Sequence, residues 1–209
     1  MTHPRKTIEF YFEFASPYSY LSSQVIEGLC RRRSVELAWK PIMLGPIIKR
    51  TGARPLFVDG LRGAYAKMDC ERWAIGAGIP FRHWAAEPVN SLKAARGVLA
   101  LMARLGPGSP LVARFIHGCF RAHFVEGKDL FDDTVLTGIV YGLGENPEDF
   151  LTDLNAGDIK QRLIEETESA FARGVFGAPT FFYDGEMFWG NDRLTILEER
   201  IALDGDPPV

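Results

Sequence analysis

The chain has 209 residues, a formal net charge of −3, 46% hydrophobic residues and 24% charged residues. This composition is ordinary for a water-soluble globular protein and suffices for one sizeable domain, or for a compact domain with a large insertion. The slightly acidic balance gives no broad attraction to nucleic acid or to an anionic membrane, and we expect neither a signal peptide nor a membrane-spanning helix.

The first predicted element is a strand over residues 8–14, "IEFYFEF", because apolar side chains recur at every second position. Ser16 then offers a capping hydroxyl, and Pro17 suits the first position of a helix that continues to about "RRRS". The stretch "VELAWKPI" predicts a second strand, which ends at Pro41.

From about residue 43 to residue 153 the pattern is helical, with loops between the helices. In "LRGAYAKMDCERWAIGAG" the apolar residues Leu61, Tyr65, Met68 and Trp73 lie three to five positions apart and predict one such helix. The stretches "NSLKAARGVLALMARLG" and "SPLVARFIHGCFRAHF" predict two more, each entered through Asn or Ser, and two shorter helices follow.

The last part begins with an amphipathic helix that ends at Gly174. "VFGAPTFFYDGEMFWG" predicts two strands joined by an Asp-Gly turn. A final helix follows, with Asn191 or Asp192 as its cap. The order of elements is that of an α/β thioredoxin-like fold with an all-helical domain inserted after the second strand, although other α/β folds share it. We therefore predict a thioredoxin-like domain over 1–42 and 155–209 and an inserted helical domain over 43–154.

The tetrapeptide "SPYS" at residues 16–19 stands at a strand–helix junction. Capping by Ser16 and packing by Tyr18 explain it completely without any function. A helix N-terminus also holds anions and lowers the pKa of thiols, so the same site suits a thiolate. Since the tetrapeptide has no cysteine, that thiolate must come from a cofactor, with Ser16 as its hydrogen-bond donor. A Ser16 nucleophile is the weaker alternative, because no glycine elbow or general base is evident.

Two other stretches offer groups for such a ligand. Pro179 lies between a glycine-containing turn and a strand, where a cis bond would expose the backbone of Ala178 for pairing with an extended peptide; the alternative is a simple strand-initiating proline. In "FWGNDRL", Asp192 beside a helix N-terminus can receive the ammonium of an α-amino acid, while helix capping is the alternative.

The sequence favours neither metal nor disulfide chemistry. Cys30, Cys70 and Cys119 are far apart, which favours reduced thiols in the cytoplasm. Cys119 and His123 share a helical spacing but have no second pair of ligands nearby, so we expect no metal. The glycines form neither a P-loop nor a dinucleotide-binding pattern.

Taken together, six stretches resemble the 2-hydroxychromene-2-carboxylate isomerases, a family related to kappa-class glutathione transferases and to DsbA-like oxidoreductases. They are "FYFEFASPYSYL", "KPIMLGPIIKRTG", "YAKMDCERWAIGAGIPF", "PVNSLKAARG", "GVFGAPTFF" and "FWGNDRL". The resemblance implies a thioredoxin-like fold, a homodimer, glutathione as cofactor and an aromatic enone acid as substrate. The implied reaction interconverts 2-hydroxychromene-2-carboxylate and trans-o-hydroxybenzylidenepyruvate through a transient thiolate adduct, in the catabolism of aromatic compounds.

The resemblance also assigns residues. It implies that Ser16 contacts the glutathione sulfur, and that the other glutathione contacts come from Ala178, Pro179, Asn191 and Asp192. It places the substrate beside Tyr18, Lys49, Arg62 and Asn90. Two positions depart from the family: Ala53 replaces the usual Asn, and Arg62 replaces the usual Lys, which changes the geometry available to a carboxylate.

Three other functions remain open at this point. A kappa-like glutathione transferase or peroxidase would consume glutathione, whereas the isomerase returns it. A non-catalytic protein would bind glutathione without turnover. A disulfide oxidoreductase is the least favoured, because positions 16 and 19 hold serine.

Overall fold

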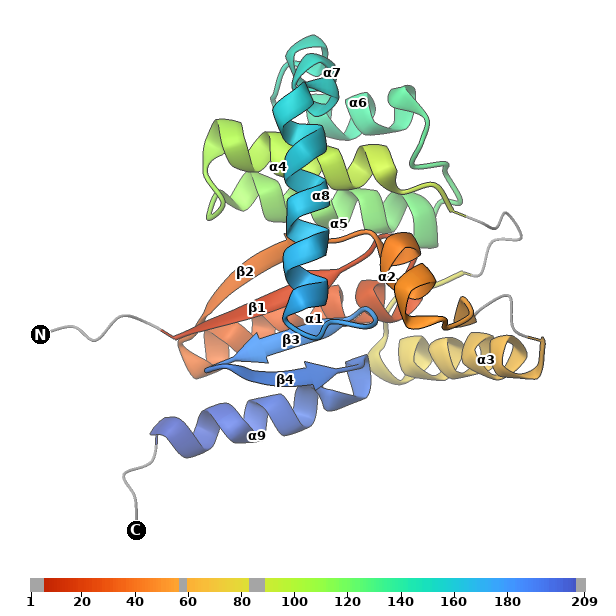
Figure 1. Cartoon of the computed structure of the whole chain (residues 1–209), viewed down its shortest axis with the longest axis vertical. Helices are drawn as coiled ribbons and strands as arrows, with labels where there is room; N and C mark the ends of the chain where they lie inside the picture. Colours follow the sequence, from red (N-terminus) through yellow and green to blue (C-terminus); the bar gives the residue numbers. More distant parts are fainter. Residues whose placement is uncertain (1–5, 57–59, 83–88, 206–209) are drawn as a thin grey trace, which may run out of the picture.

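A computed structural model describes residues 6–56, 60–82 and 89–205 of the chain (Figure 1). The strands are β1 (Thr7–Phe12), β2 (Glu36–Pro41), β3 (Thr180–Tyr183) and β4 (Glu186–Trp189). The helices before β3 are α1 (Pro17–Arg33), α2 (Leu44–Thr51), α3 (Gly60–Ala77), α4 (Leu92–Leu105), α5 (Pro110–Phe124), α6 (Asp133–Gly142), α7 (Pro147–Asn155) and α8 (Gly157–Ala172). A 3₁₀ turn, η2 (Asn191–Arg193), leads into α9 (Leu194–Gly205).

The four strands form one sheet in the order β2-β1-β3-β4. Strand β1 pairs in parallel with β2 and antiparallel with β3, and β3 pairs antiparallel with β4. Asp184 and Gly185 join β3 to β4 with φ of 52° and 81°, the positive values that a tight hairpin turn requires. This topology confirms the predicted thioredoxin-like fold and the predicted hairpin.

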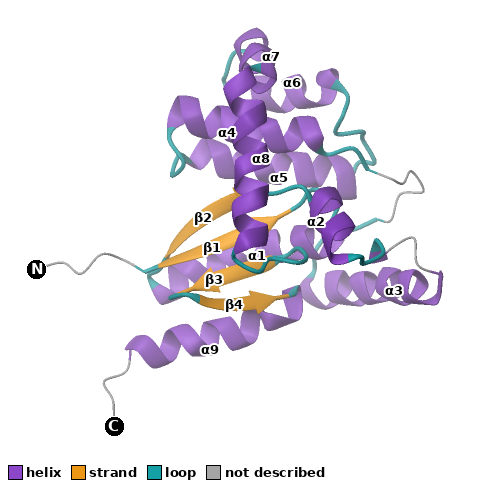
Figure 2. Ribbon diagram, viewed as in Figure 1, coloured by secondary structure: helices purple, strands orange, loops and turns teal. Residues whose placement is uncertain are grey.

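Helices cover both faces of the sheet; α1 lies behind it in the view of Figure 1, and α8 crosses in front (Figure 2). On one face Phe10 and Phe12 belong to the larger hydrophobic cluster, which includes residues of α1, α5 and α9. On the other face Tyr11 and Phe182 pack with residues of the α8 segment. Neighbouring strand residues point to opposite faces, so this double cover explains why Tyr11 is buried as well as Phe10 and Phe12.

The helices between β2 and α8 pack on the same core as the sheet. Phe120 of α5 lies 5.9 Å from Phe12 and 4.9 Å from Phe14 between ring centroids. Because the hydrophobic cluster runs across the expected boundary, the division into 1–42 with 155–209 and an inserted domain over 43–154 stays a prediction.

Helix α3 forms where the sequence predicts it, but the other side of it faces the core. Its buried residues are Gly63, Ala66, Cys70 and Ala74. Leu61, Tyr65, Met68 and Trp73, whose spacing indicated the helix, are exposed, and Leu61 is 91% exposed. These small residues let the helix approach α1 closely. The spacing of large apolar residues therefore predicted the helix correctly but did not indicate which of its faces is buried.

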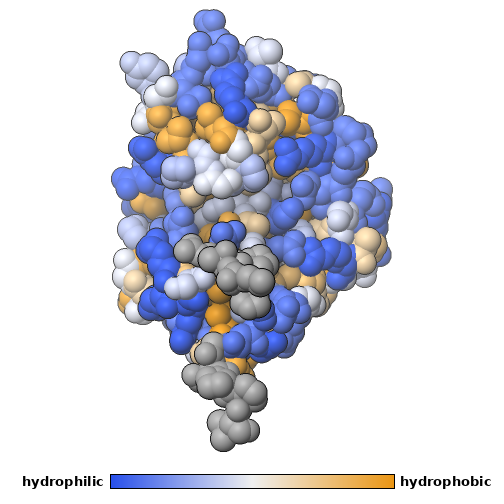
Figure 3. Space-filling model, turned by 90° about the vertical axis from the view of Figure 1, so that its left-hand side faces the viewer, coloured by the Kyte–Doolittle hydropathy of each residue, from blue (hydrophilic) through white to orange (hydrophobic). Residues whose placement is uncertain are grey.

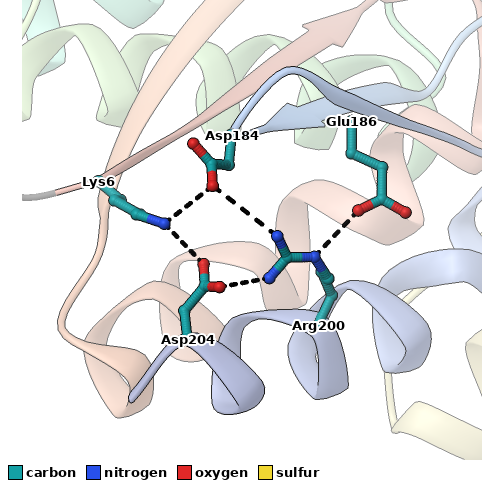
Figure 4. Close-up of polar contacts among 5 residues, drawn as sticks. All are labelled: Lys6, Asp184, Glu186, Arg200 and Asp204. Carbon is teal, nitrogen blue, oxygen red and sulfur yellow. Dashed lines mark hydrogen bonds and ion pairs between the residues drawn. The ribbon is translucent and has the colours of Figure 1, made fainter. Parts of the chain in front are cut away.

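A network of ion pairs holds α9 against the hairpin at the end of the sheet where β1 begins (Figure 4). Lys6 contacts both Asp184 and Asp204, and Arg200 contacts Asp184, Glu186 and Asp204. Figure 3 views the molecule from the side of the two termini and shows a mainly hydrophilic surface with small hydrophobic areas. Among the described residues, none of the helices is both long enough and apolar enough to span a membrane.

Candidate active site

Ser16 lies at the start of α1, after the short turn that follows β1. Its side-chain oxygen accepts a hydrogen bond from the backbone N–H of Ser19 at 3.1 Å, which confirms the predicted helix cap, and Pro17 follows in the first turn. The first turn of α1 carries no acidic side chain. Ser16 is only 7% exposed. Its hydroxyl therefore stands at the positive end of a 17-residue helix.

The stretch that precedes β3 reaches this hydroxyl. The Ser16 Oγ–H donates to the carbonyl oxygen of Ala178 at 3.0 Å, across 162 positions of sequence. The bond from Ala178 to Pro179 is cis, and the carbonyl of Pro179 accepts from the N–H of Gly190 at 3.0 Å. Two of the three stretches singled out in the sequence thus meet in direct contact, and the third is joined to them through Gly190.

Close packing around Gly177 brings β4 over the same turn. A Cβ on Gly177 would lie 2.5 Å from Nε1 of Trp189, so only glycine fits there without movement of the indole. The Trp189 ring lies 4.8 Å from the Phe176 ring between centroids. The "VFGAP" turn is therefore held between α1 and the end of β4.

Asn191 and Asp192 do not cap α9 as the sequence predicted. They form the 3₁₀ turn η2, whose preceding residue Gly190 has φ of 108°, and no side chain caps this turn. The Asp192 carboxylate instead accepts from Arg193 at 2.7 Å. Glycine at position 190 explains the difference, because it allows a sharp turn that carries the chain from β4 into α9 without an extended capping residue. Asn191 and Asp192 remain beside α1, which η2 contacts.

Tyr18 connects the first turn of α1 to α3. Its hydroxyl donates to the Asp69 carboxylate at 2.8 Å. Burial, with Cys70 and Asp69 nearby, raises the pKa of Tyr18 well above its ordinary value, so the phenol keeps its proton. Tyr18 therefore faces α3 through an ordered contact that sequence reasoning did not foresee.

The other predicted substrate residues lie on three separate elements. Lys49 is exposed on α2, Arg62 is exposed on α3, and Asn90 is exposed just before α4, where its side chain accepts from the N–H of Leu92 at 3.3 Å. Figure 1 shows α2 and α3 beyond the end of the sheet at which β1 leads into α1. Within the described residues, the hydrogen bonds of Ser16 reach none of these three side chains. Their role at the site stays a prediction, as does the effect of Ala53.

The chain's own cysteines are unsuited to thiolate chemistry. Cys30, Cys70 and Cys119 are all buried and unpaired. Burial raises the pKa of Cys30 and that of Cys70 to about 12, and it raises the pKa of Cys119 as well. The described part of the chain contains no cluster of three or more side chains able to hold a metal ion.

Sequence reasoning missed one buried group beside Ser16. Strand β1 ends at Phe12, two residues before the predicted end at residue 14. Glu13 lies in the turn that follows, and its carbonyl accepts from the N–H of Ser16 at 3.0 Å. The Glu13 carboxylate is buried and accepts from the hydroxyl of Ser91. The alternation of apolar residues places position 13 within the predicted strand, whereas β1 ends before it and Glu13 lies in a turn.

This geometry suits a small peptide with a free thiol rather than a thiol of the protein itself. A hydroxyl donor and a helix N-terminus stand where an anionic sulfur is stabilised. The Ala178 carbonyl, which accepts from Ser16, is a backbone acceptor beside this terminus, and the Asp192 carboxylate, which accepts from Arg193, is an acidic group on η2. The residues present fit glutathione, which carries a thiol, peptide groups and an α-amino acid end.

Comparisons with known proteins agree with this fold. The profile of the family described as "DSBA-like thioredoxin domain" matches residues 7–202. A protein of Pseudomonas putida named 2-hydroxychromene-2-carboxylate isomerase is 31% identical over 202 residues, covering 93% of this chain and 94% of that protein. A Caenorhabditis elegans protein named glutathione S-transferase kappa 2 is 26% identical, covering 95% of this chain and 92% of that protein.

A solved structure extends the likeness to three dimensions. It is that of a 2-hydroxychromene-2-carboxylate isomerase, and it superposes on this chain with a TM-score of 0.85 at 30% sequence identity. The superposition covers 95% of this chain and 96% of the other. The likeness therefore includes the sheet, the helices between β2 and α8, and the C-terminal hairpin with α9.

Proposed function

The chain belongs to the 2-hydroxychromene-2-carboxylate isomerase family of DsbA-like thioredoxin domains and is an isomerase, and we propose that it works with glutathione on an aromatic enone acid. The proposed substrates are 2-hydroxychromene-2-carboxylate and trans-o-hydroxybenzylidenepyruvate, or a related pair. One observation supports the glutathione site above all: the Ser16 hydroxyl, at the N-terminus of α1, lies 3.0 Å from the Ala178 carbonyl.

The chemistry that glutathione supplies when bound is reversible addition of its sulfur to a conjugated double bond. Such addition would allow rotation about that bond and would return the thiol unchanged. No oxidant or reductant is consumed. The protein must therefore lower the pKa of a thiol, hold the sulfur beside the acceptor carbon, and bind the substrate carboxylate.

Ser16 and the N-terminus of α1 carry the first task in this proposal. The hydroxyl already donates one hydrogen bond, to Ala178, and a rotation about its Cβ–Oγ bond redirects that proton toward a sulfur. The helix dipole favours the anionic form of the sulfur. Cys30, Cys70 and Cys119 cannot replace it, since all three are buried.

Positioning of the ligand falls to the "VFGAP" turn and to η2. Ala178 and Pro179 would pair with the cysteinyl backbone of glutathione, and Asn191 and Asp192 would hold its γ-glutamyl end. The proposed substrate contacts are Lys49, Arg62, Asn90 and Tyr18. Of these, Lys49 or Arg62 would bind the substrate carboxylate. Holding both reactants in this way is worth a large part of the rate enhancement.

The test is Ser16→Ala, measured by the pKa of bound glutathione and by kcat on the enone acid. We expect a higher thiol pKa and a lower kcat, because the donor to the sulfur is lost. Since Ser16→Ala also removes a helix cap, Ser109→Ala is the matched control: Ser109 caps α5 by accepting from Leu111 at 3.3 Å, and its loss should leave both quantities unchanged. Wild-type thiol ionisation and rate in Ser16→Ala would refute the assigned role.

The likeness to a kappa-class transferase supports a second candidate, in which glutathione is consumed. The count of free thiol during turnover separates the two: it stays constant for the isomerase and falls for a transferase or peroxidase. Binding of glutathione with no turnover of any enone would instead indicate a non-catalytic binding protein. A homodimer and a cytoplasmic location complete the proposal, and sedimentation of the purified protein tests the former.

A further inference from the structure

Glu13 is a buried acid in the turn that delivers the chain from β1 to Ser16. Its carbonyl accepts from the N–H of Ser16 at 3.0 Å, and its own N–H donates to the hydroxyl of Ser19 at 3.5 Å. It is only 6% exposed. The backbone of Glu13 therefore contacts both serines of "SPYS", and its side chain lies in the interior, where an acid is costly.

The Glu13 carboxylate is held from two directions. The backbone N–H groups of Phe14 and Ala15 donate to it from its own turn. From the other side it accepts from the hydroxyl of Ser91, which is 2% exposed. Desolvation raises the pKa of Glu13 to about 7, and the three hydrogen bonds oppose that rise.

Ser91 directs its hydroxyl away from its own helix. It occupies the N-cap position of α4, yet its side chain makes no capping hydrogen bond there. Asn90 takes over part of this role by accepting from the N–H of Leu92. A serine at this position ordinarily accepts a hydrogen bond from the first turn of its helix. Here the Ser91 hydroxyl donates to Glu13, 78 positions away in the sequence, and this bond ties the start of α4 to the turn before α1.

We propose that Glu13 and Ser91 form a positioning pair, which holds the start of α4, and with it Asn90, in place relative to the Ser16 hydroxyl. The inference rests on the proposed function, because Asn90 is there a substrate contact. Neither member of the pair is a catalytic residue, since neither is among the proposed contacts of glutathione or of the substrate. Their effect passes through the backbone of Ser16 on one side and through Asn90 on the other.

The pair predicts a specific kinetic pattern. Ser91→Ala should lower kcat on the enone acid about tenfold, since displacing a reactant by 1 Å costs up to about a hundredfold. The KM for glutathione should stay within about twofold, because its proposed contacts lie on the "VFGAP" turn and η2. Ser91→Thr keeps the hydroxyl and should restore kcat.

A double-mutant cycle tests whether the two residues act as a unit. Glu13→Gln keeps the shape and accepts from Phe14 and Ala15 while its NH₂ group donates to Ser91, so it should retain most of kcat. Glu13→Ala and Ser91→Ala should each cause a loss, and the double variant should lose no more than the worse single variant. Ser109→Ala, a cap far from the pair, is the control and should leave kcat unchanged.

A second readout does not depend on activity. In backbone amide NMR spectra of the wild-type protein and Ser91→Ala, the amides of Phe14, Ala15 and Ser16 should shift together with that of Leu92. Unshifted Phe14 and Ala15 amides, additive losses of kcat, or unchanged kcat in Ser91→Ala would each overturn the positioning pair. A wild-type protein with no turnover of an enone acid would overturn the proposed function, and the amide shifts would still decide on the pair.

Discussion

Replacing Glu13 by Gln should change how the stability of the protein depends on pH. The carboxyl is buried, and desolvation raises its pKa from the ordinary value of 4.5 to about 7. Between these values the folded state keeps a proton that the unfolded state has lost, so the free energy of unfolding falls as pH rises. Each unit of difference between the folded and unfolded pKa corresponds to about 1.4 kcal/mol. The free energy of unfolding therefore falls by about 3 kcal/mol by pH 8 because of this group.

Glu13→Gln cannot ionise and should escape this loss. We expect wild-type and variant proteins to differ little in their free energy of unfolding at pH 5, and the variant to be more stable at pH 8 by about 2–3 kcal/mol. The measurement is urea unfolding at pH 5 and pH 8, followed by tryptophan fluorescence and by helix content. Using the difference between two proteins cancels the titration of all other groups.

Glu9→Gln is the matched control, with the opposite sign. The hydrogen bonds from Arg173 lower the pKa of Glu9, so its contribution to stability is present at pH 8 and is lost as pH falls. Removing Glu9 should therefore weaken the protein more at pH 8 than at acid pH. If wild-type protein and Glu13→Gln lose stability in parallel from pH 5 to pH 8, Glu13 is not the buried acid that the geometry indicates.

Three further predictions follow from packing, burial and surface charge. Gly97→Ala should destabilise the protein by about 1–3 kcal/mol in urea unfolding, because the added Cβ would lie 2.7 Å from Cζ of Phe150. Gly138→Ala is the control: its Cβ would meet open space, and the substitution should stabilise the protein by up to about 1 kcal/mol. Native protein should resist thiol alkylation at pH 8, since all three cysteines are buried with raised pKa values, and mass spectrometry should find full labelling only after denaturation; rapid labelling of the folded protein would contradict the burial. Arg200→Ala should lower the Tm, and less so at high salt, because Arg200 pairs with Asp184, Glu186 and Asp204 at the surface; a Tm loss that is independent of salt would contradict the electrostatic cause.

Local patterns predicted the elements of this fold well. Ser16 and Pro17 marked the start of α1, and the Asp-Gly pair marked the hairpin, because each acts on the backbone next to it. The order of elements and the resemblance to a family then gave the architecture. Residues whose role depends on distant partners were harder: α3 buries Ala66 and Cys70 instead of its large apolar side chains, and only the packing against α1 decides this.

The site shows the same division. The sequence singled out Ser16, Pro179 and Asp192, and the structure brings Ser16 and Ala178 into contact. It gave no sign of Glu13 or Ser91, because their contact joins positions 78 residues apart and each has an adequate local explanation, a strand residue and a helix cap. Tyr18 was expected beside the substrate, and its bond to Asp69 depends on how α3 crosses α1.

The hydrogen bonds of Ser16 show how a ligand would have to enter the site under the proposed function. Its oxygen accepts from Ser19, and its single proton goes to the carbonyl of Ala178. A hydroxyl has only one proton to donate, so Ser16 cannot donate to a sulfur and to Ala178 together. The Ala178 carbonyl then needs another donor, and the cysteinyl N–H of glutathione is the group that the proposed pairing supplies. Binding of the sulfur and pairing of the peptide are therefore coupled: a thiol without a peptide N–H would leave Ala178 unpaired and should bind more weakly than glutathione.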